Sequence, residues 1–333
     1  MTFRRVMRIL GLLAGLVAGA TAAVVGLMAR RMVAPARQPL WAAPSDMGLD
    51  FETVEFPARD SVRLSGWFIP AARASDASSD GATIILVHGW TWNRLGDAAA
   101  DLLANFSGTT PVELLRLAHA LHYEGYHVLM FDLRNHGESA AQPPVTFGQT
   151  EANDLLGALA YLHTRSDVNK ERIGAIGFSM GANAVLYALP QTADLSAAIV
   201  VQPATAAVFA EGYAADLLGA AGQVVLPLIE AVYAAVSGVR LDALQPAFAA
   251  GGAGPVPVLF IQCKGDQWGS LDDANQLAAA ASGSEGPLYV DGDHRYDGYQ
   301  YLIDNPRVAA TFLGQYLKLR VAAGSQMPAS TGN

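Results

Sequence analysis

One serine of this sequence lies in a spacing that suits nucleophilic catalysis, the pentapeptide GFSMG at residues 177–181. The apolar residues 173–178 predict a buried strand before Ser179, and residues 182–189 predict a helix after it. A sharp turn between the two exposes the serine hydroxyl, and the flanking glycines let strand and helix approach closely without a clash. The helix N-terminus also directs backbone N–H groups at a developing oxyanion. We therefore predict that Ser179 is a nucleophile rather than an incidental serine in a glycine-rich turn.

Stretches typical of strands and of helices alternate along the chain beyond residue 48. Residues 51–56 and 62–69 alternate apolar and polar side chains, which predicts half-buried antiparallel strands. Runs that are apolar throughout are typical of strands buried on both faces of a parallel sheet, and they occur at residues 83–87, 127–131, 173–178, 198–201 and 258–262. Helical patterns lie between them, at residues 111–124 and 150–163 among others. This order predicts a three-layer α/β domain with right-handed crossovers.

The composition is that of a folded protein without a metal or a cofactor site. Of the 333 residues, 52% are hydrophobic and only 15% are charged, which excludes disorder of the bulk. A single cysteine excludes an internal disulfide, and no His/Cys pairs stand at zinc-ligand spacing. The net charge is −9, and residues 1–37 hold six arginines and no acid, so the remainder is more acidic still. An acidic body repels phosphate backbones, so we expect no nucleic-acid partner.

The N-terminal region has the length and composition of a membrane anchor. Residues 9–29 carry no charge and would span about 30 Å as a helix, which is the thickness of the hydrocarbon core of a bilayer. The alternative is a secretory signal cleaved near the small residues 18–20, but the apolar run continues past that site. We predict a single-pass anchor in residues 1–32 and a Pro- and Ala-rich tether in residues 33–48. Three arginines lie on each side of the span; we expect the remaining domain on the non-cytoplasmic side.

The segment between the last two buried strands is too long for an ordinary connection. It covers about residues 205–255, is rich in Ala, Leu and Val, and carries few charges. Polar residues and a proline interrupt it, so we do not expect a second membrane span: Asp216, Gln223, Pro227 and Glu230. This segment predicts a small helical cap over a cleft, within a domain at residues 49–320 that is followed by a flexible tail at 321–333.

Several motifs together resemble the α/β-hydrolase superfamily of serine hydrolases. A strand ending in His88-Gly89-Trp90 precedes the strand–GFSMG–helix unit, which is similar to the nucleophile elbow of that family. The sequence DLRNHGES at residues 132–139 resembles a loop that is mostly structural there. The resemblance covers about residues 49–320 and implies an α/β-hydrolase fold, with a mostly parallel sheet flanked by helices. GFSMGA resembles the esterase-like members more than the peptidase branch.

The resemblance also implies a catalytic triad, which runs in the order serine, acid and histidine in that family. His294 is the only one of the seven histidines that follows Ser179 in the sequence, and it is the expected base. Asp266 follows the strand at residues 258–262 and is the expected acid. Three other aspartates are less well placed in the sequence: Asp272, Asp273 and Asp293.

The oxyanion hole of that family implies two backbone donors, the N–H groups of Met180 and Trp90. Trp92 and Trp268 also lie near predicted site positions, which favours an apolar acyl or alcohol pocket, although ordinary packing beneath loops explains them equally well. An insertion at residues 95–110 is expected to shape the entrance.

These observations predict a membrane-anchored serine hydrolase that cleaves carboxylic esters through an acyl-enzyme, without a cofactor. An apolar cap on an anchored domain favours a lipophilic ester as the small-molecule substrate. The alternatives are peptidase, thioesterase, lipase or acyltransferase activity on the same triad, or a non-catalytic binding protein with this fold.

Overall fold

The computed structural model describes residues 3–72, 81–101, 103 and 110–317, so the predicted tail at 321–333 and part of the predicted insertion at 95–110 lie outside the described residues. Its centre is an eight-stranded sheet in the order β1-β2-β6-β3-β7-β8-β9-β10. β1 and β2 form an antiparallel hairpin, β2 pairs antiparallel with β6, and the other neighbours are parallel. The strands are Glu52–Pro57, Arg63–Ile69, His127–Phe131, Thr83–Val87, Ile173–Phe178, Ala197–Val201, Val258–Cys263 and Ser284–Val290, in sheet order.

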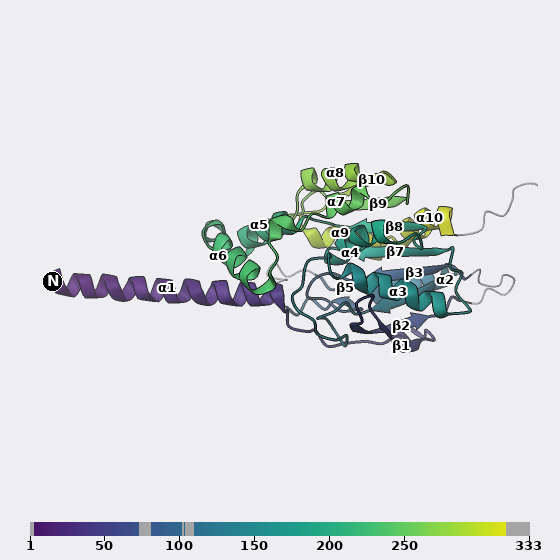
Figure 1. Ribbon diagram of the computed structural model, residues 1–333, viewed down its shortest axis with the longest axis horizontal. Coiled ribbons are helices and arrows are strands. Elements are labelled where there is room, and N and C mark those ends of the chain that lie inside the picture. The colour runs from purple at the N-terminus through teal and green to yellow at the C-terminus, as the bar shows by residue number, and fades with distance from the viewer. Residues whose placement is uncertain (1–2, 73–80, 102, 104–109, 318–333) are drawn as a thin grey trace, which may run out of the picture.

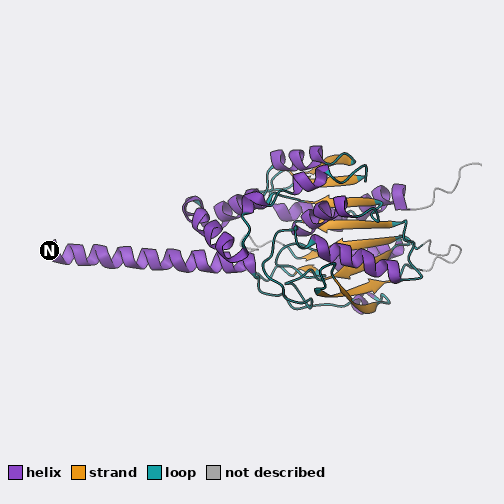
Figure 2. Cartoon of the chain, viewed as in Figure 1, coloured by secondary structure: helices purple, strands orange, loops and turns teal. Residues whose placement is uncertain are grey.

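The central strands are buried on both faces, as their continuous apolar sequences predict. Every residue of β3, β6, β7 and β8 is buried. Helices cover both sides of this sheet (Figure 2). They are α2 (Leu114–Tyr123), α3 (Ala152–Thr164), α4 (Met180–Ala188), α8 (Leu271–Ala280), α9 (Arg295–Asp304) and α10 (Pro306–Leu317).

The helix predicted at residues 111–124 begins later than its apolar pattern indicates. α2 starts at Leu114, because residues Val112–Glu113 form a short strand, β5, that pairs with β4 (Gly96–Asp97). This pairing holds the segment that follows β3, whose residues 102 and 104–109 are not described.

The first helix, α1 (Phe3–Val33), projects from the domain along the long axis of the molecule (Figure 1). By length and composition it is able to cross a membrane. Its N-terminal residues are exposed, whereas Val25, Met28, Ala29 and Met32 near its end are buried. The chain after α1 lies against the domain, where Asn93 Nδ2 donates to two backbone carbonyls of this segment, those of Gln38 and Pro39.

The chain between β8 and β9 forms three α-helices, of which α5 (Ala206–Leu218) and α6 (Ala220–Ser237) stand apart from the sheet, whereas α7 (Pro246–Gly251) packs on α4 and α8. α5 packs on α6, and α6 packs on α1. Both extend from the domain on the same side as α1 (Figure 1). In the following, the cap means α5 and α6.

Candidate active site

Ser179 lies on a sharp turn between β7 and α4, with backbone angles φ 52° and ψ −116°. The turn depends on its glycines. A Cβ on Gly181 would lie 2.2 Å from the carbonyl oxygen of Val87, and a Cβ on Gly177 would lie 2.4 Å from that of Gly181. No side chain fits at such distances. The GFSMG spacing therefore follows from the close packing of β7, α4 and β3, and this packing holds Ser179 at the carboxyl end of the sheet.

The loop after β3 lies directly against this serine. A Cβ on Gly89 would be 3.3 Å from the Cβ of Ser179, so the backbone leading into Trp90 runs beside the hydroxyl. On the other side, Met180 begins α4, and the first N–H groups of a helix have no partner within the helix. The two predicted oxyanion donors, Trp90 and Met180, thus belong to backbone segments that flank Ser179.

An arginine that the sequence analysis did not single out lies beside the serine. Arg295 is 1% exposed, and its Nη2 lies 3.4 Å from Ser179 Oγ. The same guanidinium donates from Nη1 to Asp266 Oδ2 at 2.5 Å and from Nε to the hydroxyl of Tyr299 at 2.5 Å. It also donates to the carbonyl oxygen of Gln202. Arg295 thus bridges Ser179 and Asp266.

Asp266 occupies the loop after β9, as expected for the acid. Its Oδ1 accepts from the backbone N–H of Trp268 at 3.0 Å, and its Oδ2 accepts from Gln262 Nε2 at 2.9 Å as well as from Arg295. The carboxylate is therefore oriented by several donors, and its cation partner is Arg295.

His294 caps the N-terminus of α9, where its Nδ1 accepts from the backbone N–H of Tyr296 at 3.2 Å. Its Nε2 is buried and has no hydrogen-bond partner among the described residues. The ring packs edge-on against Trp268, with 5.2 Å between centroids. Burial lowers the pKa of His294, although the charges of Asp216 and Asp266 oppose this effect. The imidazole is therefore neutral at pH 7, which is the state a base requires.

The structure thus brings two of the three predicted triad residues, Ser179 and Asp266, to one site and joins them through Arg295. Within the described part of the chain, no hydrogen bond links His294 to either of them. The catalytic roles of the three residues stay predictions. The sequence did not identify Arg295 as a site residue. It immediately follows His294, and nothing in the local pattern indicates which of two adjacent residues at the start of a helix points into the site.

Two cavities open at Ser179, and aromatic side chains form much of their walls. One has a volume of about 20 Å³ and includes Trp92, Trp268 and Tyr299 in its lining. The other has a volume of about 10 Å³, and Met180 and Arg295 are among its lining residues. Trp90 and Phe209 line both of them.

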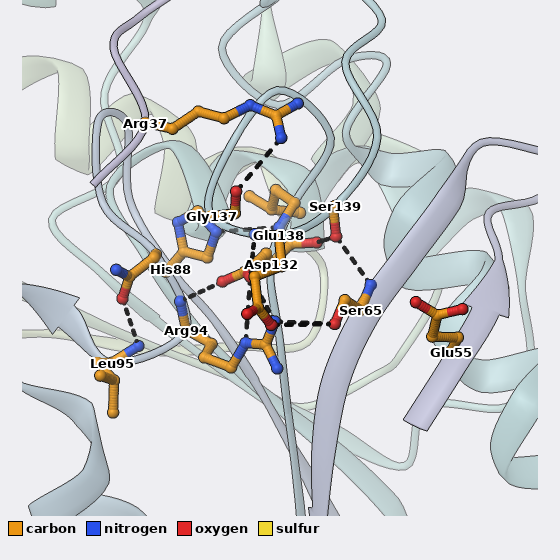
Figure 3. A network of polar contacts seen from close by, with 12 residues as sticks. Arg37, Glu55, Ser65, His88, Arg94, Leu95, Asp132, Gly137, Glu138 and Ser139 are labelled. Atoms are coloured by element: carbon orange, nitrogen blue, oxygen red, sulfur yellow. Dashed lines mark hydrogen bonds and ion pairs between the residues drawn. The ribbon is translucent and has the colours of Figure 1, made fainter. Parts of the chain in front are cut away.

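A network of polar contacts around Asp132 and Arg94 holds the DLRNHGES loop in place (Figure 3). Asp132 accepts from the backbone N–H of Arg94 at 2.7 Å and from its Nη2 at 2.6 Å, and both side chains are fully buried. It also accepts from the backbone N–H of Glu138 at 2.8 Å. Burial by itself raises the pKa of Asp132, but the hydrogen bonds and charge of Arg94 hold it below its usual range. This ion pair ties the loop after β3 to the loop after β6.

Two buried histidines complete the support. His88 Nε2 accepts from the backbone N–H of Leu133 at 3.0 Å, and His136 Nε2 accepts from that of Thr91 at 3.3 Å. Burial lowers the pKa of His88 to about 4 and that of His136 to about 3. Both rings are therefore neutral acceptors, and they position the backbone on either side of Trp90.

A search of solved structures finds the same fold in enzymes of low sequence identity. The esterase Pf2001 of Pyrococcus furiosus superposes with a TM-score of 0.63 at 20% identity, over 86% of this chain and 98% of that one. The acylaminoacyl peptidase of Pyrococcus horikoshii gives 0.53 at 18% identity, over 81% of this chain and 42% of the other. These similarities concern the fold alone.

Curated relatives match over shorter stretches. The uncharacterized protein YfhR of Salmonella typhi is 34% identical over 138 residues, which make up 41% of this chain and 40% of YfhR. The uncharacterized protein Rv2307c of Mycobacterium tuberculosis is 30% identical over 124 residues, 37% of this chain and 36% of the relative. Each match thus spans well under half the length of the relative.

A family model covers most of the chain. The model described as the alpha/beta hydrolase family matches residues 84–326, which include the GFSMG turn, Asp266 and His294. Together with the sheet order and the structural neighbours, this match confirms the predicted α/β-hydrolase fold. The chain therefore belongs to the alpha/beta hydrolase family.

Proposed function

We propose that this protein is a serine hydrolase that cleaves carboxylic esters, with Ser179 as the nucleophile. The observation that carries the proposal is the backbone of Ser179, which is held at φ 52° on the β7–α4 turn beside the Gly89–Trp90 loop and opens into apolar cavities. A non-glycine residue with positive φ is costly and is typical of functional sites. Membership of the alpha/beta hydrolase family and the esterase among its structural neighbours support the same reaction class.

In the proposed reaction, Ser179 Oγ attacks the ester carbonyl carbon while its proton passes to His294 Nε2. The oxyanion accepts from the N–H groups of Met180 and Trp90. Collapse of the tetrahedral intermediate breaks the bond to the leaving alkoxide, which takes the proton from His294. A water molecule, deprotonated by His294, then attacks the acyl-enzyme, and the proton returns to Ser179 as the carboxylic acid leaves.

This mechanism requires a rearrangement of the side chains that Ser179 faces. An arginine guanidinium stays protonated and accepts no proton, so Arg295 cannot serve as the base. We propose that His294 turns from Tyr296 towards Ser179, so that Nε2 accepts from the serine and Nδ1 donates to Asp266. The ring is half-buried and neutral, and its Nε2 has no partner in the part of the chain that the structure describes, which supports this role. Arg295 would release Asp266 in the same step.

We further propose that α1 anchors the protein in a membrane, with residues 9–29 spanning. The exposed apolar surface of its N-terminal part, which contacts no other part of the described chain, supports this assignment. The location of the hydrolase domain on the non-cytoplasmic side stays a prediction.

The test uses the full chain in detergent micelles. A fluorophosphonate probe is expected to label the protein but not the Ser179→Ala variant, and hydrolysis of p-nitrophenyl butyrate is expected to fall by roughly 10³-fold or more in that variant. The matching p-nitroanilide and thioester separate esterase from peptidase and thioesterase activity. A folded wild-type protein that is neither labelled nor active on any of the three would overturn the hydrolase proposal in favour of a binding protein.

The identity of the base is tested separately. His294→Ala is expected to lower kcat by roughly 10²- to 10⁴-fold, because general base catalysis typically contributes this much. His163→Ala is the matched control, since this partly exposed histidine of α3 lies outside the site, with its Nε2 3.6 Å from Asp194 Oδ1. Equal activity of the two variants would exclude His294 as the base.

A further inference from the structure

A third cavity lies between α1 and the cap. It is narrow, with a volume of about 20 Å³, and its walls include Met28 and Met32 of α1, Leu217 of α5 and Leu226 of α6. Its lining side chains are apolar apart from Tyr213 and Arg31. The guanidinium of Arg31 pairs with Asp101 at 2.5 Å. The walls of this narrow cavity are therefore apolar except at Tyr213 and at the paired Arg31.

This cavity adjoins the two cavities at Ser179. Trp90 and Phe209 line all three, and their rings pack edge to face with 5.8 Å between centroids. The Trp90–Phe209 pair thus lies where the three cavities adjoin.

One exposed face of α6 is apolar along the length of the helix. Val224, Leu228, Val232 and Val236 stand four residues apart on one face and are 75%, 50%, 38% and 65% exposed. Glu230 is the only charged residue of α6, and it is half-buried. A helix exposed to water normally carries charges on its outer face, so this face is suited to a hydrocarbon environment.

The position of α6 relative to α1 indicates which environment that is. α6 packs beside the C-terminal third of α1, where Val25, Met28 and Ala29 are buried (Figure 1). All three residues lie in the last turns of the apolar run at residues 9–29. At 1.5 Å per residue, the last nine residues of that run cover about 13 Å of depth. If α1 spans the bilayer, α6 lies beside acyl chains, and Arg31 lies near the headgroups.

We propose that the cap is immersed in one leaflet beside α1, and that the narrow cavity between α1 and the cap widens to admit the acyl chain of a membrane-resident ester lipid. The acyl chain lies among Met28, Met32 and Leu226, and its ester group reaches Ser179 past Trp90 and Phe209. This proposal rests on the proposed function, and it names the substrate class as a long-chain ester drawn laterally from the bilayer rather than from water.

The first experiment measures substrate choice with the full chain in phosphatidylcholine vesicles. Leu217→Trp fills the cavity, and it is compared with Ala215→Trp, an exposed position of the same helix that does not line the cavity. Hydrolysis of p-nitrophenyl palmitate in the vesicles is expected to fall at least tenfold in Leu217→Trp, while hydrolysis of water-soluble p-nitrophenyl acetate stays within twofold. Ala215→Trp is expected to match the wild type on both. Equal losses of activity on the two esters, or no loss of activity on the palmitate, would overturn the proposal that the acyl chain enters through this cavity.

The second experiment tests immersion without relying on catalysis. The single cysteine is replaced by Cys263→Ser, and an environment-sensitive fluorophore is attached at Val232→Cys on α6 or, as the control, at Tyr123→Cys at the end of α2. Lipids carrying a nitroxide on the acyl chain are expected to quench the label on α6 at least threefold more than the label on α2. Equal quenching would overturn the immersed cap. If the wild type hydrolyses neither ester, the proposed function fails, and the quenching still decides where the cap lies.

Discussion

Arg295 and Asp266 form an ion pair in which both side chains are only 1% exposed and Nη1 lies 2.5 Å from Oδ2. The pair stands where a Ser-His-Asp hydrolase needs an imidazole between the serine and the acid. The other terminal nitrogen of the guanidinium, Nη2, lies 3.4 Å from Ser179 Oγ. In this arrangement Arg295, and not His294, is the partner of Asp266.

The energetic coupling of this pair is the first prediction. Arg295→Met and Asp266→Asn are each expected to lower the free energy of unfolding, Arg295→Met by about 3–5 kcal/mol, because it leaves the buried Asp266 carboxylate without its cation partner. The double variant is expected to lose less than the sum of the two. The measurement is urea unfolding of the full chain in detergent.

An exposed ion pair provides the control for this cycle. Arg63 and Glu55 are 54% and 58% exposed, so Arg63→Met is expected to change the free energy of unfolding by at most about 1 kcal/mol. If the two substitutions at Arg295 and Asp266 changed the free energy of unfolding in a strictly additive way, this would contradict an energetic coupling between the two side chains.

The close packing around the GFSMG turn leads to a second prediction. Gly181→Ala is expected to lower the free energy of unfolding by about 3 kcal/mol or more, because its Cβ would lie 2.2 Å and 2.5 Å from the backbone oxygens of Val87 and His88, which cannot move aside like a flexible side chain. Gly251→Ala is the control, since the nearest atom to its Cβ is 3.8 Å away. Thermal unfolding monitored by circular dichroism compares the two, and a tolerated Gly181→Ala would refute the packing described.

The two buried histidines make stability depend on pH. Their pKa values in the folded protein, about 4 for His88 and about 3 for His136, lie below the ordinary value of 6.5. The unfolded chain therefore binds more protons below about pH 6.5. Stability is fully present above that pH and falls as the pH drops towards 4. We expect the free energy of unfolding in urea to decrease by roughly 2–4 kcal/mol between pH 8 and pH 5.

A variant assigns this effect to its source. In His136→Gln the free energy of unfolding is expected to depend less steeply on pH around pH 5. Its slope should correspond to the uptake of about one proton fewer on unfolding, because one of the two titrating groups is gone. A wild-type stability that stays constant from pH 8 to pH 5 would contradict neutral, buried histidines at both positions.

The pH dependence of hydrolysis gives a fourth prediction, which rests on His294 as the base. Burial lowers the pKa of His294, so the acid limb of kcat/KM for p-nitrophenyl butyrate is expected below pH 6.5. The charge of Asp216 opposes this effect of burial, so Asp216→Asn is expected to move the limb to still lower pH. A limb above pH 6.5, or a shift in the opposite direction in the variant, would argue against this base.

Local patterns in the sequence were sufficient to predict those parts of the fold that depend on residues close together in the sequence. Continuous apolar runs indicated strands buried on both faces, and β3, β6, β7 and β8 are buried throughout, because two covered faces require apolar side chains at every position. The glycine spacing located the turn at Ser179 for a similar reason, since only glycine fits the close approach of β7 to α4.

Features that depend on distant segments were decided by the tertiary structure alone. His294 and Arg295 are adjacent at the start of α9, and the angle at which that helix enters the site places the arginine, not the histidine, between Ser179 and Asp266. The cavity beside α1 likewise joins helices that lie about 200 residues apart in the sequence. The sequence by itself determined the sheet, the serine turn and the apolar helices, because these follow from residue type and spacing, whereas the partners of each side chain depend on how whole elements pack against one another.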